Sequence, residues 1–388
     1  MDLLTSFSFA TVPLILSAPG ATKELGPELR ARFPAIRRVL LVTDQGFLRT
    51  GLADAPIHSL RAAMFHVEQF TEVVADPPEH VIEKALVLAR EHDIELVIGL
   101  GGGSSMDVAK LVAVLANSAQ SMAEIYGIGN VHGSRLPLVQ IPTTAGTGSE
   151  VTNISIVTTG ATTKKGVVAP QLYADMAILD AELTIGLPPA VTAATGIDAM
   201  VHAIEAYTSK HKKNPLSDGL ARQALSLLSR HLIRACENGH DLAARQAMLL
   251  GAMLAGQAFA NAPVAAVHAL AYPIGGIFHV PHGLSNSLVL PHVLRFNAEA
   301  CVEQYAELAT IVVPHVDGSV AARAEALAVA MQQFGTITGL PRTLSQVGIT
   351  ASDLDLLADD AMKQVRLLGN NPRTVTREDA YALYKLAL

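Results

Sequence analysis

The first half of the chain alternates short apolar runs with amphipathic segments. Residues 37–44 (RRVLLVTD), 94–103 (IELVIGLGGG) and 136–144 (LPLVQIPTT) are aliphatic or β-branched runs that end in polar or turn residues, a pattern typical of buried parallel strands. Between the first two lies 77–93, where apolar residues recur on one helical face after a proline start. This β-α-β pattern predicts a doubly wound parallel sheet.

The pattern changes after residues 181–191. Strand-like runs almost vanish, and residues 219–236 and 241–260 have the composition and apolar periodicity of helices. A chain of 388 residues is too long for one ordinary core. We therefore predict an α/β domain over 1–187 and an all-helical domain over 188–388, with the boundary at Pro188 and Pro189.

Charge and cysteine usage narrow the class of protein. The net charge is −7 and no block of five like charges occurs, which argues against a nucleic-acid partner. Cys236 and Cys301 have no CxxC spacing, so they predict neither a disulfide framework nor a thiolate metal site. The first 21 residues superficially resemble a signal peptide but contain no basic residue before Lys23. A cytoplasmic location is expected.

One long segment carries no charge. Residues 246–294 contain no Asp, Glu, Lys or Arg, which by itself would suggest a membrane helix. The segment is interrupted too often for a lipid-facing helix by Gln257, Asn261, Pro263, His268, Pro273, His279 and His282. We predict instead the deep interior of a protein outside the membrane, in which the four histidines His268, His279, His282 and His292 are candidates for chemistry.

Two small-residue loops follow predicted strands. In GLGGGSSMDVAK (99–110), glycines would let the backbone approach a ligand, and free N–H groups at a helix start favour an anion such as a pyrophosphate. Ser104 stands where the third glycine of GxGxxG would be, so a plain strand-to-helix turn is the alternative. IPTTAGTGSEVT (141–152) is a hydroxyl-rich loop or a solvated turn. Two such loops at neighbouring strand ends favour a ligand site.

Asp44 ends the strand predicted over 37–44. An acid there can accept hydrogen bonds from a ribose 2′-OH and would repel a 2′-phosphate, which favours NAD over NADP. The same residue could equally form an Asx turn.

The segment DAMVHAIEAY (198–207) places three ionisable groups on one helix face. Asp198 and His202 are one turn apart, and Glu205 shares their face. With His268 and His282 they would offer a carboxylate and three imidazoles, which suit Fe(II), Zn(II) or another borderline divalent cation and not Mg or Ca. The alternative is a hydrogen-bonded polar network, because buried ionisable groups are costly unless paired or metal-bound.

The motifs GGGSSMDVAK, IPTTAGTGSEVT, TGIDAMVHAIEAYTS and HALAYPIGGIFHVPHGLSN occur in this order. Together they resemble the iron-containing (group III) alcohol dehydrogenase family, with its dehydroquinate synthase-like fold, over nearly the whole chain. The resemblance implies a dinucleotide-binding first domain and an active site in the cleft between the domains. It implies four metal ligands, Asp198, His202, His268 and His282. It implies an NAD(P) site lined by Gly102, Gly103, Ser104, Thr143, Thr144, Thr147, Thr152 and Lys165, with Asp44 near the adenosine ribose.

The sequence departs from the family pattern in two places. Tyr272 stands where many members have a second histidine in HAxAHP, which is proposed there as a proton relay. The resemblance also implies that His279 faces the substrate, so the relay could run through Tyr272, His279, the ribose hydroxyls or water. Asp76 in VADPP replaces an asparagine expected near the cofactor, and we assign it no role.

The expected function is reversible oxidation of a small primary alcohol or diol to its aldehyde. Hydride would pass to or from NAD, with NADP less favoured, while Fe(II), or alternatively Zn(II), acts as a Lewis acid on the substrate oxygen. A hydroxyacid or maleylacetate-type reductase and a dehydroquinate synthase-type lyase are alternatives. Both handle anionic substrates, and the absence of Lys and Arg from residues 246–294 favours a neutral one.

A rival from another class is a binding or structural protein that keeps NAD and metal only for stability, which a turnover assay would decide. The mean hydropathy of +0.34 predicts a homo-oligomer, a dimer or larger.

Overall fold

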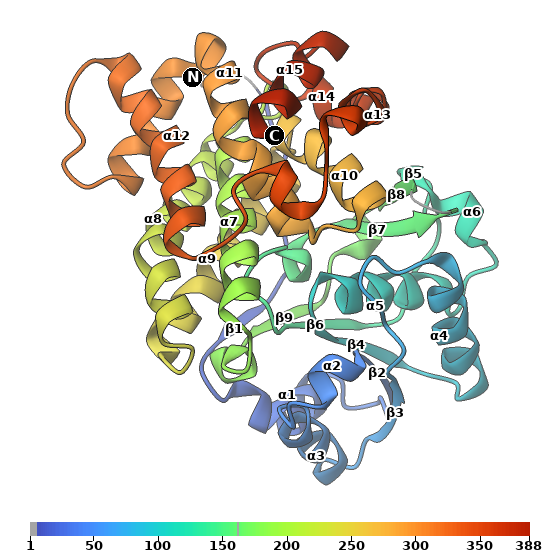
Figure 1. Cartoon of the computed structure of the whole chain (residues 1–388). Coiled ribbons are helices and arrows are strands. Elements are labelled where there is room, and N and C mark those ends of the chain that lie inside the picture. The colour runs from blue at the N-terminus through green and yellow to red at the C-terminus, as the bar shows by residue number, and fades with distance from the viewer. Residues whose placement is uncertain (1–5, 161–162) are drawn as a thin grey trace. The chain divides into compact units, whose positions relative to one another are not determined.

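The computed structural model describes residues 6–160 and 163–388, so residues 1–5 of the N-terminal stretch lie outside the described residues. Two compact units are present (Figure 1): an α/β unit over Thr11–Gly186, and a helical unit over Leu187–Leu388 with the described residues before Thr11. The strands of the α/β unit are β1 (Ile15–Ser17), β2 (Arg38–Val42), β3 (His66–Phe70), β4 (Leu96–Gly101), β5 (Gly127–Ile128), β6 (Leu138–Pro142), β7 (Ile154–Thr159), β8 (Thr163–Val168) and β9 (Met176–Leu179). Its α-helices are α1 (Leu25–Arg32), α2 (Gln45–Leu48), α3 (Asp54–Ala62), α4 (Glu79–Glu91), α5 (Gly103–Leu115) and α6 (Met122–Ile125).

The main sheet of the α/β unit has the strand order β1-β9-β6-β4-β2-β3, and all its strand pairs are parallel. β2, β4 and β6 are the three strands predicted from the sequence, and α4 is the predicted crossover helix. From β2 the chain first adds β3 on one side and then returns to place β4 on the other. The order therefore reverses between β2 and β4, and such a switch point is where open α/β sheets bind ligands.

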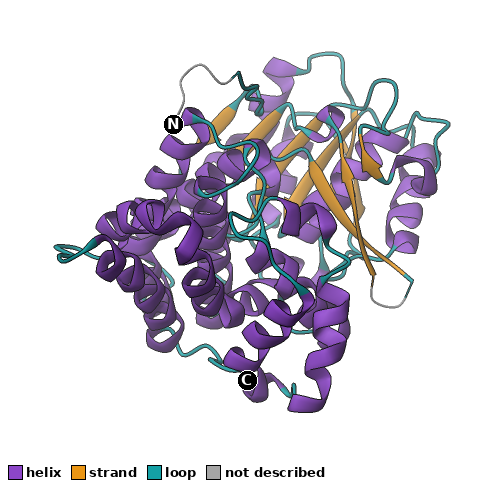
Figure 2. Ribbon diagram, turned by 90° about the horizontal axis from the view of Figure 1, so that it is seen from above, coloured by secondary structure: helices purple, strands orange, loops and turns teal. Residues whose placement is uncertain are grey.

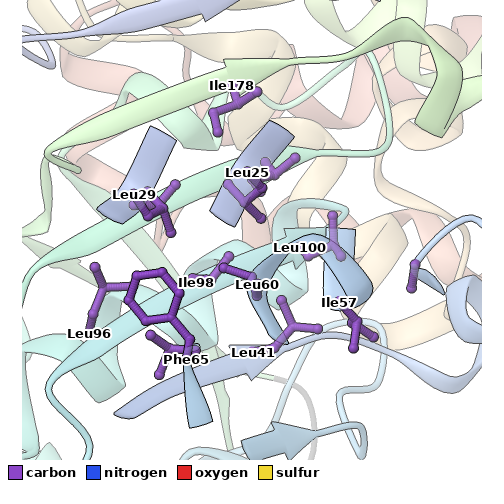
Figure 3. Packing of buried hydrophobic residues seen from close by; sticks show 14 of the residues in the cluster. Leu25, Leu29, Leu41, Ile57, Leu60, Phe65, Leu96, Ile98, Leu100 and Ile178 are labelled. Atoms are coloured by element: carbon purple, nitrogen blue, oxygen red, sulfur yellow. The ribbon is translucent and has the colours of Figure 1, made fainter. Parts of the chain in front are cut away.

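Helices cover both faces of this sheet. Alternate residues of β4, namely Leu96, Ile98 and Leu100, belong to the same buried cluster as Leu25 and Leu29 of α1 (Figure 3). Gly99 faces the other way, where a Cβ on it would lie 2.9 Å from the Cβ of Ala109 in α5. A parallel sheet buried on both faces explains why its strands are continuously apolar. The predicted doubly wound α/β fold is confirmed.

A second, three-stranded sheet, β5-β8-β7, was not predicted. β7 and β8 pair antiparallel, and β5 pairs parallel with β8. Side chains of β7 alternate between half-buried and buried positions, so its sequence is too polar to resemble the strands of the main sheet.

The helical unit consists of helices throughout its described length, as predicted (Figure 2). Its α-helices are α7 (Pro189–Tyr207), α8 (Pro215–Glu237), α9 (Leu242–Asn261), α10 (Ala266–Phe278), α11 (His282–Val312), α12 (Val320–Ile337), α13 (Leu354–Ala361), α14 (Val365–Gly369) and α15 (Arg377–Ala387). α7 is buried on almost every side. A Cβ on Gly196 would lie 2.5 Å from Leu232 in α8 and 2.7 Å from Met248 in α9. This glycine therefore allows both neighbours to pack closely against α7.

Within the described part of the chain, no single helix is long and apolar enough to cross a membrane. α9 and α10 meet that criterion only as a pair, and the pair is bent by 107°. The uncharged segment falls on these two helices and the start of α11, where most side chains are buried in the unit's own core.

Candidate active site

Four predicted metal ligands converge inside the helical unit. Asp198 and His202 lie one turn apart on α7, His268 lies in the first turn of α10, and His282 is the first residue of α11. One ligand atom from each residue lies within 4.8 Å of the other three. Asp198, His202 and His268 are buried, and His282 is half-buried. Residues up to 84 positions apart in the sequence thus form one cluster.

The distances in the cluster suit a shared ion better than a hydrogen-bonded network. The Nε2 atoms of His202, His268 and His282 lie 3.9, 3.7 and 3.6 Å from Oδ1 of Asp198. These separations are too long for hydrogen bonds. Nitrogen and oxygen donors at about 2.1 Å from one ion lie roughly 3–4 Å from one another. The residues present therefore fit a divalent metal.

Glu205 fixes the orientation of one imidazole. Its Oε2 lies 2.7 Å from Nδ1 of His268, and its Oε1 accepts a hydrogen bond from the backbone N–H of Val267 at 2.7 Å. Because a carboxylate only accepts, the proton of His268 lies on Nδ1. The lone pair of Nε2 is then on the side of Asp198 and of Nδ2 of Asn286, which lie 3.7 and 3.4 Å from Nε2. A carboxylate behind a histidine in this way orients it as a metal ligand.

Asp198 is held in its ionised form. Burial alone would raise the pKa of this carboxyl, but the imidazoles of His202, His282 and His268 and the amide of Asn286 outweigh burial and hold the pKa below its ordinary value. Asn286, one turn after His282, donates to Oδ1 of Asp198 at 2.6 Å. A buried carboxylate among imidazoles supplies the negative charge that a divalent cation requires.

A glycine brings α11 against α7. A Cβ on Gly283 would lie 2.3 Å from the carbonyl oxygen of Ala194. No side chain fits at that distance, so only glycine allows the first turn of α11 to approach the backbone of α7. This approach places His282 within reach of Asp198.

The two predicted catalytic residues both belong to α10: Tyr272 lies within the helix and His279 at its C-terminal end. Tyr272 is half-buried one turn after His268, and its ring centroid lies 6.0 Å from that of His282. His279 is the C-cap of α10, is exposed, and has the left-handed backbone conformation with φ 56°. A histidine in this conformation is uncommon and strained relative to glycine.

The glycine loop, which is the predicted cofactor loop within residues 99–110, lies at the switch point of the main sheet. Gly101 ends β4, and Gly102 is the N-cap of α5 without a side-chain capping bond. The N–H groups of the first turn of α5 are therefore left for another acceptor, as an anion site requires. A Cβ on Gly103 would lie 2.8 Å from Cγ2 of Thr147, so the second predicted loop packs directly on the first.

Asp44 takes the turn-forming role considered for it, and its place near the ribose stays a prediction. Its Oδ1 accepts a hydrogen bond from the N–H of Phe47 at 2.8 Å and caps α2. Its Oδ2 would lie 3.6 Å from a Cβ on Gly101, so the carboxylate sits between the ends of β2 and β4. Capping uses one oxygen and leaves the second facing the glycine loop.

The remaining predicted cofactor residues differ in accessibility. Thr143 and Thr152 are buried, whereas Ser104, Thr144 and Thr147 are half-buried. The hydroxyl of Thr152 accepts a hydrogen bond from Lys110 at 3.0 Å and is engaged in the interior. Lys165 lies on β8 in the second sheet, with Nζ 5.2 Å from the ring centroid of Tyr126. The structure thus gathers the glycines and threonines at one sheet edge, with Lys165 on a separate sheet.

Sequence reasoning missed three residues around these two sites. Asn286 was missed in the metal cluster, and Asp107 and Lys110 were missed beneath the glycine loop. The signals were present: Asn286 follows His282 at helical spacing, and both others lie within GGGSSMDVAK. Asn286 was overlooked because asparagine is uncharged and costs less to bury than an ion. Asp107 and Lys110 were overlooked because a Lys three residues after an Asp is ordinary on an exposed helix.

Glu150 gives a prediction for stability against pH. This carboxyl is buried, and burial raises its pKa from 4.5 to about 7, although its own backbone hydrogen bond and Lys110 oppose the rise. Between those two pH values the folded chain binds more protons than the unfolded chain, so stability falls as pH rises. The shift corresponds to about 3 kcal/mol. We expect Glu150→Gln, which cannot ionise, to gain stability over the parent between pH 5 and pH 8.

The measurement is the difference in thermal midpoint between variant and parent, expected to widen by about 5 °C over this range. Glu83→Gln, which alters an exposed carboxylate on α4, is the control and is expected to show a flat difference. A flat difference for Glu150→Gln as well would contradict the raised pKa.

Comparison with known proteins identifies the family. The family profile described as iron-containing alcohol dehydrogenase matches residues 13–181, and the one described as Fe-containing alcohol dehydrogenase family, C-terminal, matches residues 192–388. The chain is 43% identical over 377 residues to long-chain-alcohol dehydrogenase 1 of Geobacillus thermodenitrificans, covering 95% of this chain and 93% of the relative. It is 34% identical over 383 residues to NAD-dependent methanol dehydrogenase of Bacillus methanolicus, covering 98% and 100%.

A solved structure agrees with these sequence matches. The crystal structure of a 1,3-propanediol oxidoreductase superposes with a TM-score of 0.95 at 33% identity, covering 99% of this chain and 100% of that one. These three relatives are named as dehydrogenases or oxidoreductases of alcohols or a diol, and a sulfoacetaldehyde reductase of Bilophila wadsworthia is 36% identical over 382 residues. The protein is thus an oxidoreductase, and the chain belongs to the iron-containing alcohol dehydrogenase family.

Proposed function

We propose that this chain interconverts a small primary alcohol or diol and its aldehyde, with NAD as hydride carrier and Fe(II), or alternatively Zn(II), as the metal. The observation that carries the proposal is the cluster of Asp198, His202, His268 and His282, whose ligand atoms lie within 4.8 Å of one another. One carboxylate and three imidazoles suit these cations and not Mg or Ca.

The chemistry divides between the bound groups and the protein. When bound, the metal polarises the carbon–oxygen bond of the substrate and the nicotinamide accepts or donates a hydride. Glu205 holds the proton of His268 on Nδ1 and so keeps Nε2 directed at Asp198. We assign exchange of the hydroxyl proton with solvent to Tyr272 and His279, because Tyr272 lies near His282 and His279 is exposed.

We assign the dinucleotide to the edge of the main sheet between β2 and β4. The uncapped start of α5 suits a pyrophosphate, and Gly102, Gly103 and Ser104 leave the backbone accessible there. Thr143, Thr144, Thr147, Thr152 and Lys165 are assigned to the same cofactor by family resemblance. The free oxygen of Asp44 suits a ribose hydroxyl and disfavours the phosphate of NADP.

The absence of basic residues from the uncharged segment supports a neutral substrate. Residues 246–294, which supply two of the four proposed ligands, contain no Lys or Arg to bind an anionic group. This favours alcohols over hydroxyacid or maleylacetate-type substrates and over the lyase substrate. We further propose a cytoplasmic homodimer or larger assembly, on the basis of two free cysteines and a mean hydropathy of +0.34.

The preference for NAD is tested by Asp44→Asn. Asparagine retains an oxygen that can accept from the N–H of Phe47, so α2 keeps its cap, while the negative charge is lost. We expect the ratio of kcat/KM for NAD to that for NADP to fall by about tenfold, mainly because NADP improves, which corresponds to roughly 1.4 kcal/mol. An unchanged ratio would mean that Asp44 does not face the ribose.

The proposed function is tested by metal analysis and turnover together. Anaerobically purified protein is analysed for metal and assayed for NADH formation from alcohols and diols of increasing chain length, before and after chelation. We expect about one Fe or Zn per chain, with activity lost on chelation and restored by metal. If the protein stays metal-free and inactive after reconstitution, the four-residue cluster is only a polar network and the proposed function is wrong.

A further inference from the structure

His268 lies in a part of α10 that the helix itself holds weakly. The helix begins at Ala266 after Ala265, whose side chain makes no capping bond. The first N–H groups of a helix have no acceptor inside it. Pro273 lies within the helix and lacks the N–H that would bond the carbonyl oxygen of Ala269. His268 therefore lies between an uncapped start and a missing helical hydrogen bond, so its position depends on contacts from outside α10.

Two side chains from outside α10 hold the backbone on either side of His268. Before it, the hydroxyl of Ser209 donates to the carbonyl oxygen of Pro263 at 2.9 Å. After it, the hydroxyl of Tyr384 donates to the carbonyl oxygen of Leu270 at 2.7 Å. Both donors are buried. Ser209 follows α7 and Tyr384 belongs to α15, so the two contacts come from near the two ends of the helical unit's sequence.

The hydroxyl of Tyr384 is not needed to fill space. The residue has a relative exposure of 0%, and a phenylalanine would fill nearly the same volume without a polar atom to satisfy. Burial raises the pKa of the phenol well above its ordinary value, so the group keeps its proton and donates. A carbonyl oxygen has two lone pairs, so Leu270 accepts this bond without giving up a helical one. The hydroxyl thus adds a fixed link from α15 to the turn that follows His268.

The carboxylate of Glu205 acts on the same stretch of chain from α7. It binds Nδ1 of His268 and the N–H of Val267, each at 2.7 Å. Glu205 therefore orients the imidazole, whereas Ser209 and Tyr384 hold the backbone from which the imidazole extends. Metal ligands must be held to within about 0.5 Å of their productive position. A larger displacement of this turn would take Nε2 of His268 away from an ion shared with the other three residues.

We propose that Tyr384 and Ser209 are positioning residues for the metal site, which hold the backbone on either side of His268 and so set the affinity for metal. The inference rests on the proposed function, because it takes the four-residue cluster as a metal site. The single hydroxyl proton of each residue is used on a backbone carbonyl, so neither donates to a ligand side chain. α15 supplies none of the four ligands, yet through Tyr384 it fixes the position of one of them.

The test compares Tyr384→Phe and Ser209→Ala with the parent, each as metal-free protein titrated with zinc or cobalt. Tyr381→Phe is the matched control, because Tyr381 is half-buried one turn earlier on α15. It removes a phenol hydroxyl from the same helix and leaves the bond to Leu270 in place. The first readout is the zinc dissociation constant from competition with a chelator. The others are the visible absorption bands of bound Co(II), which respond to ligand geometry, and the thermal midpoint with and without zinc.

We expect Tyr384→Phe to raise the zinc dissociation constant about fivefold to tenfold, because one buried hydrogen bond beside a ligand is lost. Ser209→Ala is expected to raise it about threefold, since Pro263 lies farther from His268 along the chain. Both variants are expected to change the cobalt bands and to gain less thermal stability from zinc than the parent gains. Tyr381→Phe is expected to match the parent in all three measurements.

Unchanged zinc affinity in folded Tyr384→Phe would overturn the proposal. So would a loss of thermal midpoint that is equal with and without zinc, because a residue that only stabilises the fold lowers both midpoints alike. If Tyr384→Phe does not fold, Ser209→Ala decides, and parent-like zinc affinity in that variant overturns the proposal. A parent that binds zinc but oxidises no alcohol contradicts only the proposed function, whereas a parent that binds no zinc contradicts the metal site and with it both proposals.

Discussion

His268→Ala is expected to yield protein without bound metal and with kcat lowered by at least about 1,000-fold. The substitution removes one of three imidazoles from the cluster and takes from Oε2 of the buried Glu205 its contact with His268, while Oε1 keeps the N–H of Val267. Breaking a buried charged hydrogen bond is costly beyond the loss of the ligand. Metal analysis and steady-state kinetics on the same preparation measure both effects.

The matched control is His292→Ala. His292 lies on α11 in the same uncharged segment, but it does not belong to the four-residue cluster. We expect this variant to retain one metal per chain and kcat within a few-fold of the parent. If metal-free His268→Ala still oxidised alcohols at the parent's rate, the Lewis-acid role of the metal would be wrong.

Glu205→Gln is expected to weaken metal binding 10- to 100-fold while leaving all four proposed ligands in place. Glu205 accepts two hydrogen bonds, from His268 and from the backbone of Val267. Glutamine has only one accepting oxygen, so its amide would donate to Nδ1 of His268 and move the imidazole proton to Nε2. A protonated Nε2 has no lone pair for a metal.

The readout that separates this effect from a catalytic one is the metal dissociation constant, measured by competition with a chelator. At saturating metal, kcat is expected to recover to within about tenfold of the parent. Glu307→Gln serves as the control, because Glu307 accepts from Tyr207 at the end of the same helix without contacting the cluster. Equal metal affinities for parent and Glu205→Gln would show that Glu205 does not orient His268.

The main features of the fold could be predicted because each followed from a strong local pattern. The strands of the doubly wound sheet are buried on both faces and are therefore continuously apolar, which makes them conspicuous in the sequence. The sheet of β5, β7 and β8 was missed because its strands are short or half-polar. Its pairing depends on contacts between segments that no local pattern encodes.

The residues of the candidate metal cluster could be predicted only in part from the local sequence. Asp198 and His202 share a helix turn, so their proximity follows from helix geometry. The choice of His268 and His282 over His279 and His292 came from family resemblance, since four histidines in one uncharged segment are equivalent until the fold places them. Asn286 and Lys110 depend on contacts across 88 and about 40 residues, which spacing alone cannot reveal.

Gly283 has a bearing on how this enzyme can be altered. It binds no ligand and offers no functional group, yet the carbonyl of Ala194 leaves no room for even one extra carbon there. Mutant libraries restricted to residues that carry reactive side chains would leave this position out. A library that also varies positions such as Gly283, where two backbones pack closely, would map the architecture of the site more completely than one restricted to reactive side chains.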